Sequence, residues 1–332
     1  MKRKFGMPSS TKILAARVTQ IRAVEKNMIK EILNEFSIVS GELRNEELGY
    51  ITFVQDEMAR ERIEHSFFLV FHKGEWLWPG GVAEQVNWST TSLTVVKEPK
   101  EQALFLGLWG DIYRVGSGDA KEESALANLT DGPKSNGPMR CIRAIDGRAY
   151  AVGMGCQVYV RKGVDSWERM DEGIRLDHST GQSFETLHGL NVTSIYAAGR
   201  RGEIWHYDGV QWVQEDSPTN RIITDLWCSP SGSVFACGQA GTVLVKSGGV
   251  WRFIDHQATE DDFWSVREFG GKVYLATMRE VYELTGNSVT RTDFGPDAPE
   301  TCFALSVAGK RMWSVGAKNI FSFDGTSWTR LA

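Results

Sequence analysis

Residues that could carry out chemistry are scattered through the 332-residue chain and form no familiar catalytic motif. The sequence contains no HExxH pair for zinc, no Gly-Lys-Ser/Thr loop for phosphate, no GxSxG nucleophile turn and no paired CxxC dyads. The six histidines are spread along the chain: His65, His72, His178, His188, His206 and His256. We therefore expect no catalytic centre of a known type, no metal site and no cofactor.

Candidate binding residues emerge when positions 39 residues apart are compared. One such position holds Asp225, Trp264 and, in an earlier copy, Arg140. A position that serves packing alone is expected to repeat its chemistry, so this mixture indicates a used surface. The alternative is that the position meets only water, which relaxes the choice of residue. The predicted partner-binding residues lie at the position of Asp225, at the position two residues after it, or in the loops that precede these positions. They are Arg140, Glu185, His188, Asp225, Trp227, Asp261, Asp262 and Trp264.

The comparison rests on an internal repeat. The segment "SIYAAGRRGEIWHYDGVQW" at 194–212 returns as "SVFACGQAGTVLVKSGGVW" at 233–251. With a step of 39 residues, the slot of the glycine in "YAAG" recurs at Gly199, Gly238, Thr277 and Gly316. Earlier and less regular copies place the slot at Gly153, Gly107 and Phe71. Seven copies therefore fill the chain from about residue 48 to its end.

Each copy has the pattern of a small antiparallel sheet. Apolar residues alternate with a period of two, and glycine-containing turns separate four runs in the best copy. Asp208-Gly209 is a typical hairpin turn. Such a sheet must stack against its neighbours, so the sequence predicts an all-β fold, a seven-bladed β-propeller of four-stranded antiparallel blades. The tryptophans after the third turn are predicted to wedge between blades: Trp167, Trp212, Trp251 and Trp328.

The pattern of apolar run, glycine, apolar run, Asp-Gly and tryptophan resembles bacterial single-domain β-propellers of the YVTN, Asp-box and WD40-like repeat class, including photosystem II assembly factor-like repeats. The resemblance covers about 285 residues of the chain, by the repeat limits given above. No Trp-Asp dipeptide occurs, and Asp208 and Gly209 are adjacent, unlike the spacing of an Asp-box. The resemblance therefore implies the fold and leaves the narrower family open.

The first 47 residues are predicted to form an extension, and residues 48–332 the propeller, which we expect to close without a swapped terminal strand. Within the extension, the apolar spacing from about residue 24 to 36 predicts a short amphipathic helix that docks on the propeller, binds a partner or forms a dimer contact. Residues 1–30 carry eight basic residues and one acidic residue, a net charge of +7. The formal charge of the chain is −5, so the remainder carries −5 − 7 = −12.

Composition favours a cytoplasmic protein. The five cysteines are an odd number without paired spacing, which suits a reducing compartment. The basic N-terminus lacks the apolar stretch of a secretory signal, and no apolar run reaches the ~18 residues of a membrane span. We therefore expect no membrane association.

The leading functional hypothesis is a non-catalytic propeller that binds a protein, and a specific version is an immunity protein neutralising a basic toxin. An acidic propeller would attract a basic protein and repel nucleic acid, which we disfavour as a partner. Two alternatives remain open: a hydrolase or lyase acting on a sugar or other small molecule at the channel mouth, and an assembly scaffold. The sequence does not indicate an oligomeric state.

Overall fold

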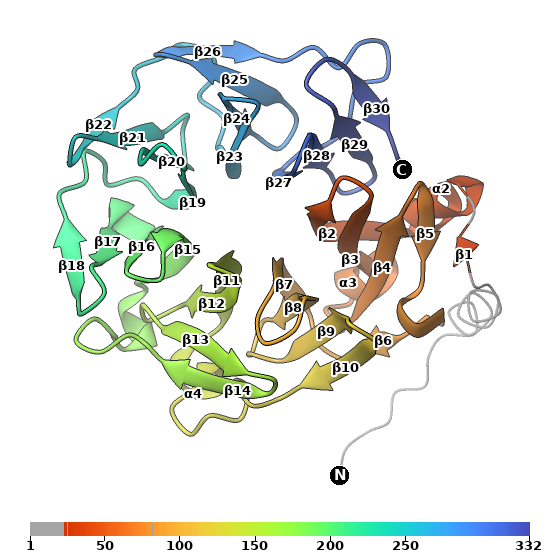
Figure 1. The fold of residues 1–332 in the computed structure, drawn as a ribbon, viewed down its shortest axis with the longest axis horizontal. Coiled ribbons are helices and arrows are strands. Elements are labelled where there is room, and N and C mark those ends of the chain that lie inside the picture. The colour runs from red at the N-terminus through yellow and green to blue at the C-terminus, as the bar shows by residue number, and fades with distance from the viewer. Residues whose placement is uncertain (1–22, 25, 82) are drawn as a thin grey trace.

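The strands form seven sheets arranged around one central axis in the computed structural model, which describes residues 23–24, 26–81 and 83–332 (Figure 1). Six sheets have four antiparallel strands each, and the first has six. The predicted all-β, seven-bladed propeller is thereby confirmed. Within the described ranges, no helix has both the length and the apolar character needed to cross a membrane.

Blades 2 to 7 each consist of four consecutive strands that run from the axis to the outside (Figure 1). Blades 2 to 4 are β7 (Thr90–Val96), β8 (Gln102–Gly107), β9 (Ile112–Gly116), β10 (Asp119–Glu123); β11 (Met139–Ile145), β12 (Arg148–Gly153), β13 (Val158–Gly163), β14 (Ser166–Arg169); and β15 (Phe184–Asn191), β16 (Ser194–Gly199), β17 (Ile204–Tyr207), β18 (Trp212–Glu215). Blades 5 to 7 are β19 (Ile223–Cys228), β20 (Val234–Gly238), β21 (Val243–Ser247), β22 (Val250–Phe253); β23 (Ser265–Phe269), β24 (Lys272–Ala276), β25 (Val281–Thr285), β26 (Ser288–Arg291); and β27 (Ala304–Ala308), β28 (Arg311–Val315), β29 (Ile320–Phe323), β30 (Trp328–Arg330).

Blade 1 begins earlier than the sequence predicted. Its strands are β2 (Phe36–Asn45), β3 (Leu48–Gln55), β4 (Ser66–His72) and β5 (Glu75–Leu77), with β1 (Ala23–Val24) paired to β5 and β6 (Gln85–Val86) paired to β4. The innermost strand, β2, lies wholly before residue 48. The predicted boundary between 1–47 and 48–332 is therefore wrong, and the propeller starts at Phe36. The remaining short helices are α3 (Asp56–Arg60), α4 (Pro133–Asn136), η1 (Pro79–Gly81), η2 (His178–Thr180) and η3 (Arg200–Gly202).

The error has a local cause. The glycine slot ends the second strand of a blade, as Gly153 and Gly199 show by pairing with the first residues of β11 and β15. In blade 1 this place is held by Gln55, which pairs with Phe36, whereas Phe71 belongs to the third strand. Strands with alternating apolar residues resemble one another in sequence. Because blade 1 has no glycine at this place, the repeat comparison matched its third strand to the second strands of the other blades.

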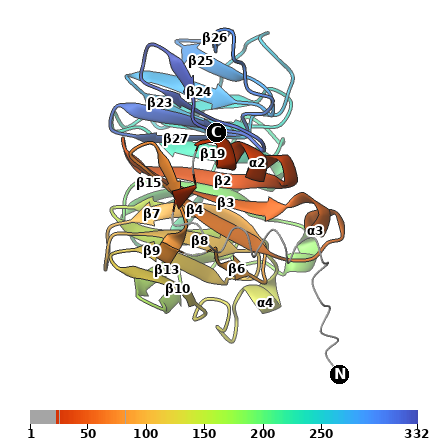
Figure 2. The same ribbon diagram turned by 90° about the vertical axis from the view of Figure 1, so that its right-hand side faces the viewer.

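Among the strands that the structure describes, the ring closes between blade 1 and blade 7 without exchange of a strand, as predicted. Main-chain and side-chain hydrogen bonds join the two blades, from Ile38 N to Ala317 O at 2.8 Å and from Leu43 N to Ser306 Oγ at 2.8 Å. The predicted helix is α2 (Lys26–Glu35), which lies beside β2 near the C-terminus of the chain (Figure 2). Most of the predicted basic charge of the extension lies in residues 1–22, outside the described residues.

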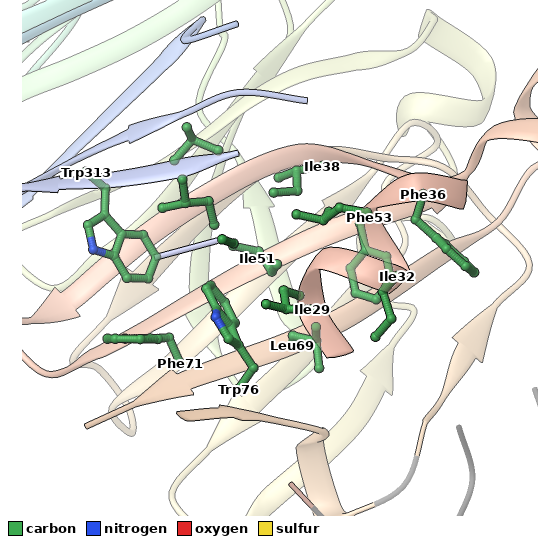
Figure 3. Close-up of a cluster of buried hydrophobic side chains, with 14 of the residues drawn as sticks. Ile29, Ile32, Phe36, Ile38, Ile51, Phe53, Leu69, Phe71, Trp76 and Trp313 are labelled. Carbon is green, nitrogen blue, oxygen red and sulfur yellow. The ribbon is translucent and has the colours of Figure 1, made fainter. Parts of the chain in front are cut away.

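The helix packs into the apolar core at this seam (Figure 3). Ile29 and Ile32 of α2 are buried in one cluster with Trp76 of blade 1 and Trp313 of blade 7. The contact is close, because a Cβ atom at Gly49 would lie 2.3 Å from the Trp313 ring. Glycine is therefore required at position 49 for Trp313 to reach blade 1.

The outer tryptophans lie between blades as predicted. Trp212 on β18 is buried and donates from Nε1 to the carbonyl of Met170 in the preceding blade at 2.7 Å. Trp251 on β22 donates to Glu215 at 2.6 Å, again across a blade boundary. The indoles thus join neighbouring sheets by apolar contact and by a hydrogen bond.

Candidate partner-binding site

The seven inner strands place two rings of side chains around the channel. Each inner strand contributes one channel-lining residue near its start and a second one two positions later, because side chains alternate along a strand. The first ring is Ser40, Ser92, Cys141, Thr186, Asp225, Ser265 and Ala304. The second ring is Glu42, Thr94, Arg143, His188, Trp227, Arg267 and Ser306.

A third circle of residues, the rim, surrounds the mouth before the first ring. In blades 1 to 5 the register of the inner strand shifts by one residue at this point, and the extra residue lines the mouth. Bulges of this kind redirect a side chain without ending the sheet. The rim consists of these five residues and the two that precede β23 and β27: Val39, Thr91, Arg140, Glu185, Thr224, Trp264 and Phe303.

The rim and the first ring enclose a funnel of about 580 Å³. The funnel is open because six of the seven residues of the first ring are small. Its floor is formed by three residues of the second ring, Glu42, Arg143 and Arg267. A separate cavity of about 210 Å³ lies on the other side of this floor and is lined by His188 and Trp227.

Asp225 is the exception in the first ring, and it is buried under two guanidinium groups. Arg267 Nη1 donates to its Oδ2 at 2.5 Å and Arg143 Nη2 to its Oδ1 at 3.0 Å. The carboxylate also accepts from Thr186 Oγ1 at 3.1 Å and from Val266 N at 3.1 Å. Burial alone would raise the pKa of Asp225, but the two arginines and these hydrogen bonds outweigh it and hold the pKa well below its usual range.

Several ring residues tie one blade to the next. In the second ring, Thr94 Oγ1 accepts from Ala144 N of the following blade at 3.0 Å. His188 Nδ1 occupies the equivalent place and accepts from Cys228 N at 3.0 Å. This acceptor role requires the neutral imidazole. Burial, Arg267 and Arg143 all lower the pKa of His188, to about 3, which keeps it neutral.

Three predicted site residues lie on the rim: Arg140, Glu185 and Trp264. Arg140 Nε lies 3.4 Å from Glu185 Oε2, and Arg200 from η3 donates to Glu185 at 3.3 Å. Trp264 stands on the rim with 44% of its surface exposed, and Met278 in the adjoining loop is equally exposed. The mouth therefore combines an apolar side with a charged side.

The other predicted residues have different places. Asp225 lies below the rim and is fully engaged, while His188 and Trp227 lie in the second ring and face the smaller cavity. Asp261 and Asp262 belong to the loop before β23 and do not line the funnel. Asp262 accepts from Ala240 N at 2.8 Å, which fixes the neighbouring loop, whereas Asp261 is exposed.

The alignment of Asp225 with Trp264 is corrected by the strand register. Asp225 on the first strand of blade 5 pairs with Cys237 on the second strand. In blade 6 the residue equivalent to Cys237 is Ala276, and it pairs with Ser265, so Ser265 is the true equivalent of Asp225. The turn between the first two strands is one residue shorter in blade 6, so a fixed step placed Trp264 in the wrong ring. Two functional residues were not among the predicted site residues, Arg143 and Arg200. Arg143 could have been found, because it lies two positions after Cys141 and side chains alternate along a strand.

The fold and the channel define a seven-bladed propeller of the WD40-like class, and solved structures agree. The chain is similar to YCF48 bound to D1 peptide (TM-score 0.62, 13% identity, covering 87% of this chain and 91% of that one). It is also similar to the WD40 β-propeller domain of Doa1 (TM-score 0.58, 12% identity, 89% and 92%) and to YCF48 from Cyanidioschyzon merolae (0.61, 13%, 87% and 96%). These likenesses show the fold alone.

Sequence similarity gives the narrower relationship. No protein-family model matches the chain. The chain is 41% identical over 306 residues to the immune protein Tsi7 of Pseudomonas aeruginosa. The match covers 92% of this chain and 100% of that protein. The chain belongs to the family of the immune protein Tsi7. The hypothesis of a non-catalytic immunity propeller with a protein partner is thereby confirmed, and the hydrolase, lyase and scaffold alternatives are not favoured.

Proposed function

We propose that the chain neutralises a protein toxin by binding it across the rim of the funnel. The observation that carries this proposal is the exposure of Trp264 at the mouth, in a chain whose other eleven tryptophans, all within the described residues, are buried or half-buried. Trp264 is exposed beside Met278, and Phe303 is the next rim residue. Aromatic residues and methionine are enriched at protein interfaces, where tryptophan often provides much of the binding energy.

Charge around the rim supports a basic partner. The loops before β23 and β27, residues 254–264 and 292–303, together contain seven carboxylates and neither lysine nor arginine: Asp255, Glu260, Asp261, Asp262, Asp293, Asp297 and Glu300. Asp297 is paired with Arg330, while Glu260 and Asp261 are exposed. These two loops flank Trp264 and Phe303, so an approaching basic surface is attracted to the apolar side of the mouth. The same charges oppose nucleic acid.

The channel itself supports binding at the mouth rather than passage through it. Arg143 and Arg267 are held across the channel by the buried carboxylate of Asp225, which closes the floor with a network spanning blades 3, 5 and 6. A rigid floor under an open funnel provides a preformed surface. Preformed surfaces lose little conformational entropy on binding, which favours tight complexes.

A cytoplasmic location without membrane contact is part of the proposal. Its support is that all five cysteines are buried free thiols, as suits a reducing compartment: Cys141, Cys156, Cys228, Cys237 and Cys302. Burial raises the pKa of several of them, which keeps these thiols protonated and unreactive.

The test is protection of cells from a toxin encoded beside the gene for this chain. Co-expression of the wild-type chain should restore growth, and the purified proteins should form a complex. The double variant Trp264→Ala/Met278→Ala should fold, with an unchanged melting temperature, and fail to protect. Val250→Ala/Phe253→Ala, which removes comparably exposed apolar side chains from the outer strand β22, is the matched control and should protect fully. Full protection by the rim variant would refute the rim as the contact face.

A further inference from the structure

The funnel has unused hydrogen-bond donors. Arg140 Nε and Arg143 Nε are buried and make no hydrogen bond to any described residue, although Arg140 Nε lies 3.4 Å from the Glu185 carboxylate. Both belong to β11, and both line the funnel because the bulge at Arg140 brings residues three positions apart to the same cavity. Buried donors without an acceptor are costly, so the funnel is suited to a group that accepts hydrogen bonds.

The charges around the funnel favour the same kind of group. Four guanidinium groups line it, and three carboxylates: Arg140, Arg143, Arg200, Arg267, Glu42, Glu185 and Asp225. Asp225 is occupied by Arg143, Arg267 and neighbouring donors, and Glu185 is shared by Arg140 and Arg200. Burial raises the pKa of Glu42, although Arg143, Arg267 and Ser306 oppose this, which weakens the third negative charge. The interior is therefore cationic beneath acidic loops.

This distribution discriminates between possible occupants. A lysine or arginine side chain would bring a positive charge toward Arg143 and Arg267 on the floor. An apolar side chain would leave the Arg140 and Arg143 donors unpaired. A carboxylate is attracted by the guanidinium groups that line the funnel, and arginine binds carboxylates with a favourable planar geometry.

We propose that the funnel is a carboxylate-binding site that receives an acidic side chain of the protein partner. The proposal rests on the proposed function, because the occupant must enter past Trp264 and Met278, the apolar part of the proposed interface. A volume of about 580 Å³ is large enough for a loop that carries the acidic residue. The partner recognised here is thus a basic protein with one carboxylate at the centre of its contact surface.

Such an arrangement confers specificity. Basic proteins in general are attracted to the loops at 254–264 and 292–303 but meet the guanidinium floor if they insert a basic side chain. A basic protein that presents a carboxylate at the right place satisfies both parts of the surface. Repulsion of the wrong side chain and attraction of the right one together discriminate between partners.

The carboxylate site is tested first with a small probe. N-acetylglutamate α-methylamide, whose only carboxylate is that of the side chain, is titrated into the ¹⁵N-labelled chain. The Nε–Hε signals of Arg140 and Arg143 and the indole signal of Trp264 are followed by NMR. We expect saturable shifts with this probe and none with N-acetylglutamine α-methylamide, its neutral counterpart. Arg140→Gln should weaken probe binding about tenfold or more, since a charge-assisted hydrogen bond is lost. Arg252→Gln, on the exposed face of β22, is the matched control and should bind as wild type. Equal shifts with both probes, or no saturable shift, would overturn the site.

The occupant is tested by competition with the toxin partner. Binding of the toxin should abolish the shifts caused by the probe. Substituting the responsible Asp or Glu of the toxin by Asn or Gln should leave a complex in which the probe binds again. If the toxin binds and the probe is not displaced, the occupant is wrong while the proposed function stands. If no toxin binds but the probe does, the proposed function fails and the funnel is a site for free carboxylates.

Discussion

Arg267 Nη1 lies 2.5 Å from Asp225 Oδ2, so that the second ring of blade 6 is bound to the first ring of blade 5. The same carboxylate holds Arg143 of blade 3 at 3.0 Å, across the width of blade 4. A short buried pair of this kind fixes the relative position of blades that do not share a strand. The funnel floor therefore depends on a network that also holds the ring together.

Substitution of Asp225 by asparagine should destabilise the propeller. Removing the charge leaves two buried guanidinium groups without their anion, and breaking a buried pair in this way costs about 3–5 kcal/mol. Urea unfolding should show the loss. Asp261→Asn, at an exposed carboxylate on the same face, is the control and should change the free energy of unfolding by less than about 0.5 kcal/mol. A D225N protein as stable as wild type would mean that the network is incidental to stability.

His188 should make stability depend on pH. Its folded-state pKa of about 3 lies below the ordinary value of 6.5, so protonation favours the unfolded chain. The contribution of His188 is complete above about pH 6.5 and is lost as the pH falls toward about 3, with a slope of up to ~1.4 kcal/mol per pH unit. His188→Thr, which copies Thr94 in the equivalent place, should reduce the slope between pH 6.5 and 5. Identical slopes for both proteins would contradict the buried neutral imidazole.

The helix α2 should act as a structural part of the ring closure. Ile29 is fully buried against Trp76 and Trp313, and truncating such a side chain costs about 2–5 kcal/mol (Figure 3). Ile29→Ala should therefore lower the melting temperature, while Lys30→Ala, at the exposed neighbour, should not. Differential scanning calorimetry separates the two. Equal melting temperatures would show that the seam is stable without the helix.

The sequence predicted what repeats and missed what differs between blades. The spacing of Gly199, Gly238 and Gly316 was sufficient for the fold, because each ends or directly follows the second strand of a blade. It was insufficient for the site, since a turn that is one residue shorter moves Trp264 from the first ring to the rim. Contacts such as that of Arg143 with Asp225 join residues 82 positions apart, and no local pattern reports them.

The two classes of tryptophan should respond differently to substitution. Trp212 is buried between blades, so Trp212→Ala should cost about 3–5 kcal/mol of stability and leave toxin binding intact at temperatures where the variant is folded. Trp264→Ala should leave stability nearly unchanged and speed dissociation of the complex more than tenfold, as loss of a central aromatic contact does at about 2 kcal/mol. Thermal melts and surface plasmon resonance measure both. Normal dissociation from the Trp264 variant would exclude it as a main contact.

The acidic loops should govern the rate of association. Exposed charges more than about 10 Å apart are screened at 0.1 M salt, so association with a basic toxin should slow about tenfold or more as salt rises from low to physiological levels, while dissociation changes less. Reversal of two exposed charges of the loop before β23, Glu260→Lys/Asp261→Lys, should slow association at low salt and reduce its salt dependence.

Asp262 is left in place in this test because its side chain holds the main chain at Ala240, and its loss would disturb the loop itself. The matched control reverses two exposed charges on the turns at the opposite face, Glu47→Lys/Glu75→Lys, which changes the net charge equally. Steering by the rim predicts a larger effect from the first pair than from the second, because the field near the contact face dominates the final approach. Equal effects of the two pairs would indicate attraction by net charge alone. An association rate independent of salt would remove the reason for expecting a basic partner, and would leave the apolar contact at Trp264 as the main determinant of recognition.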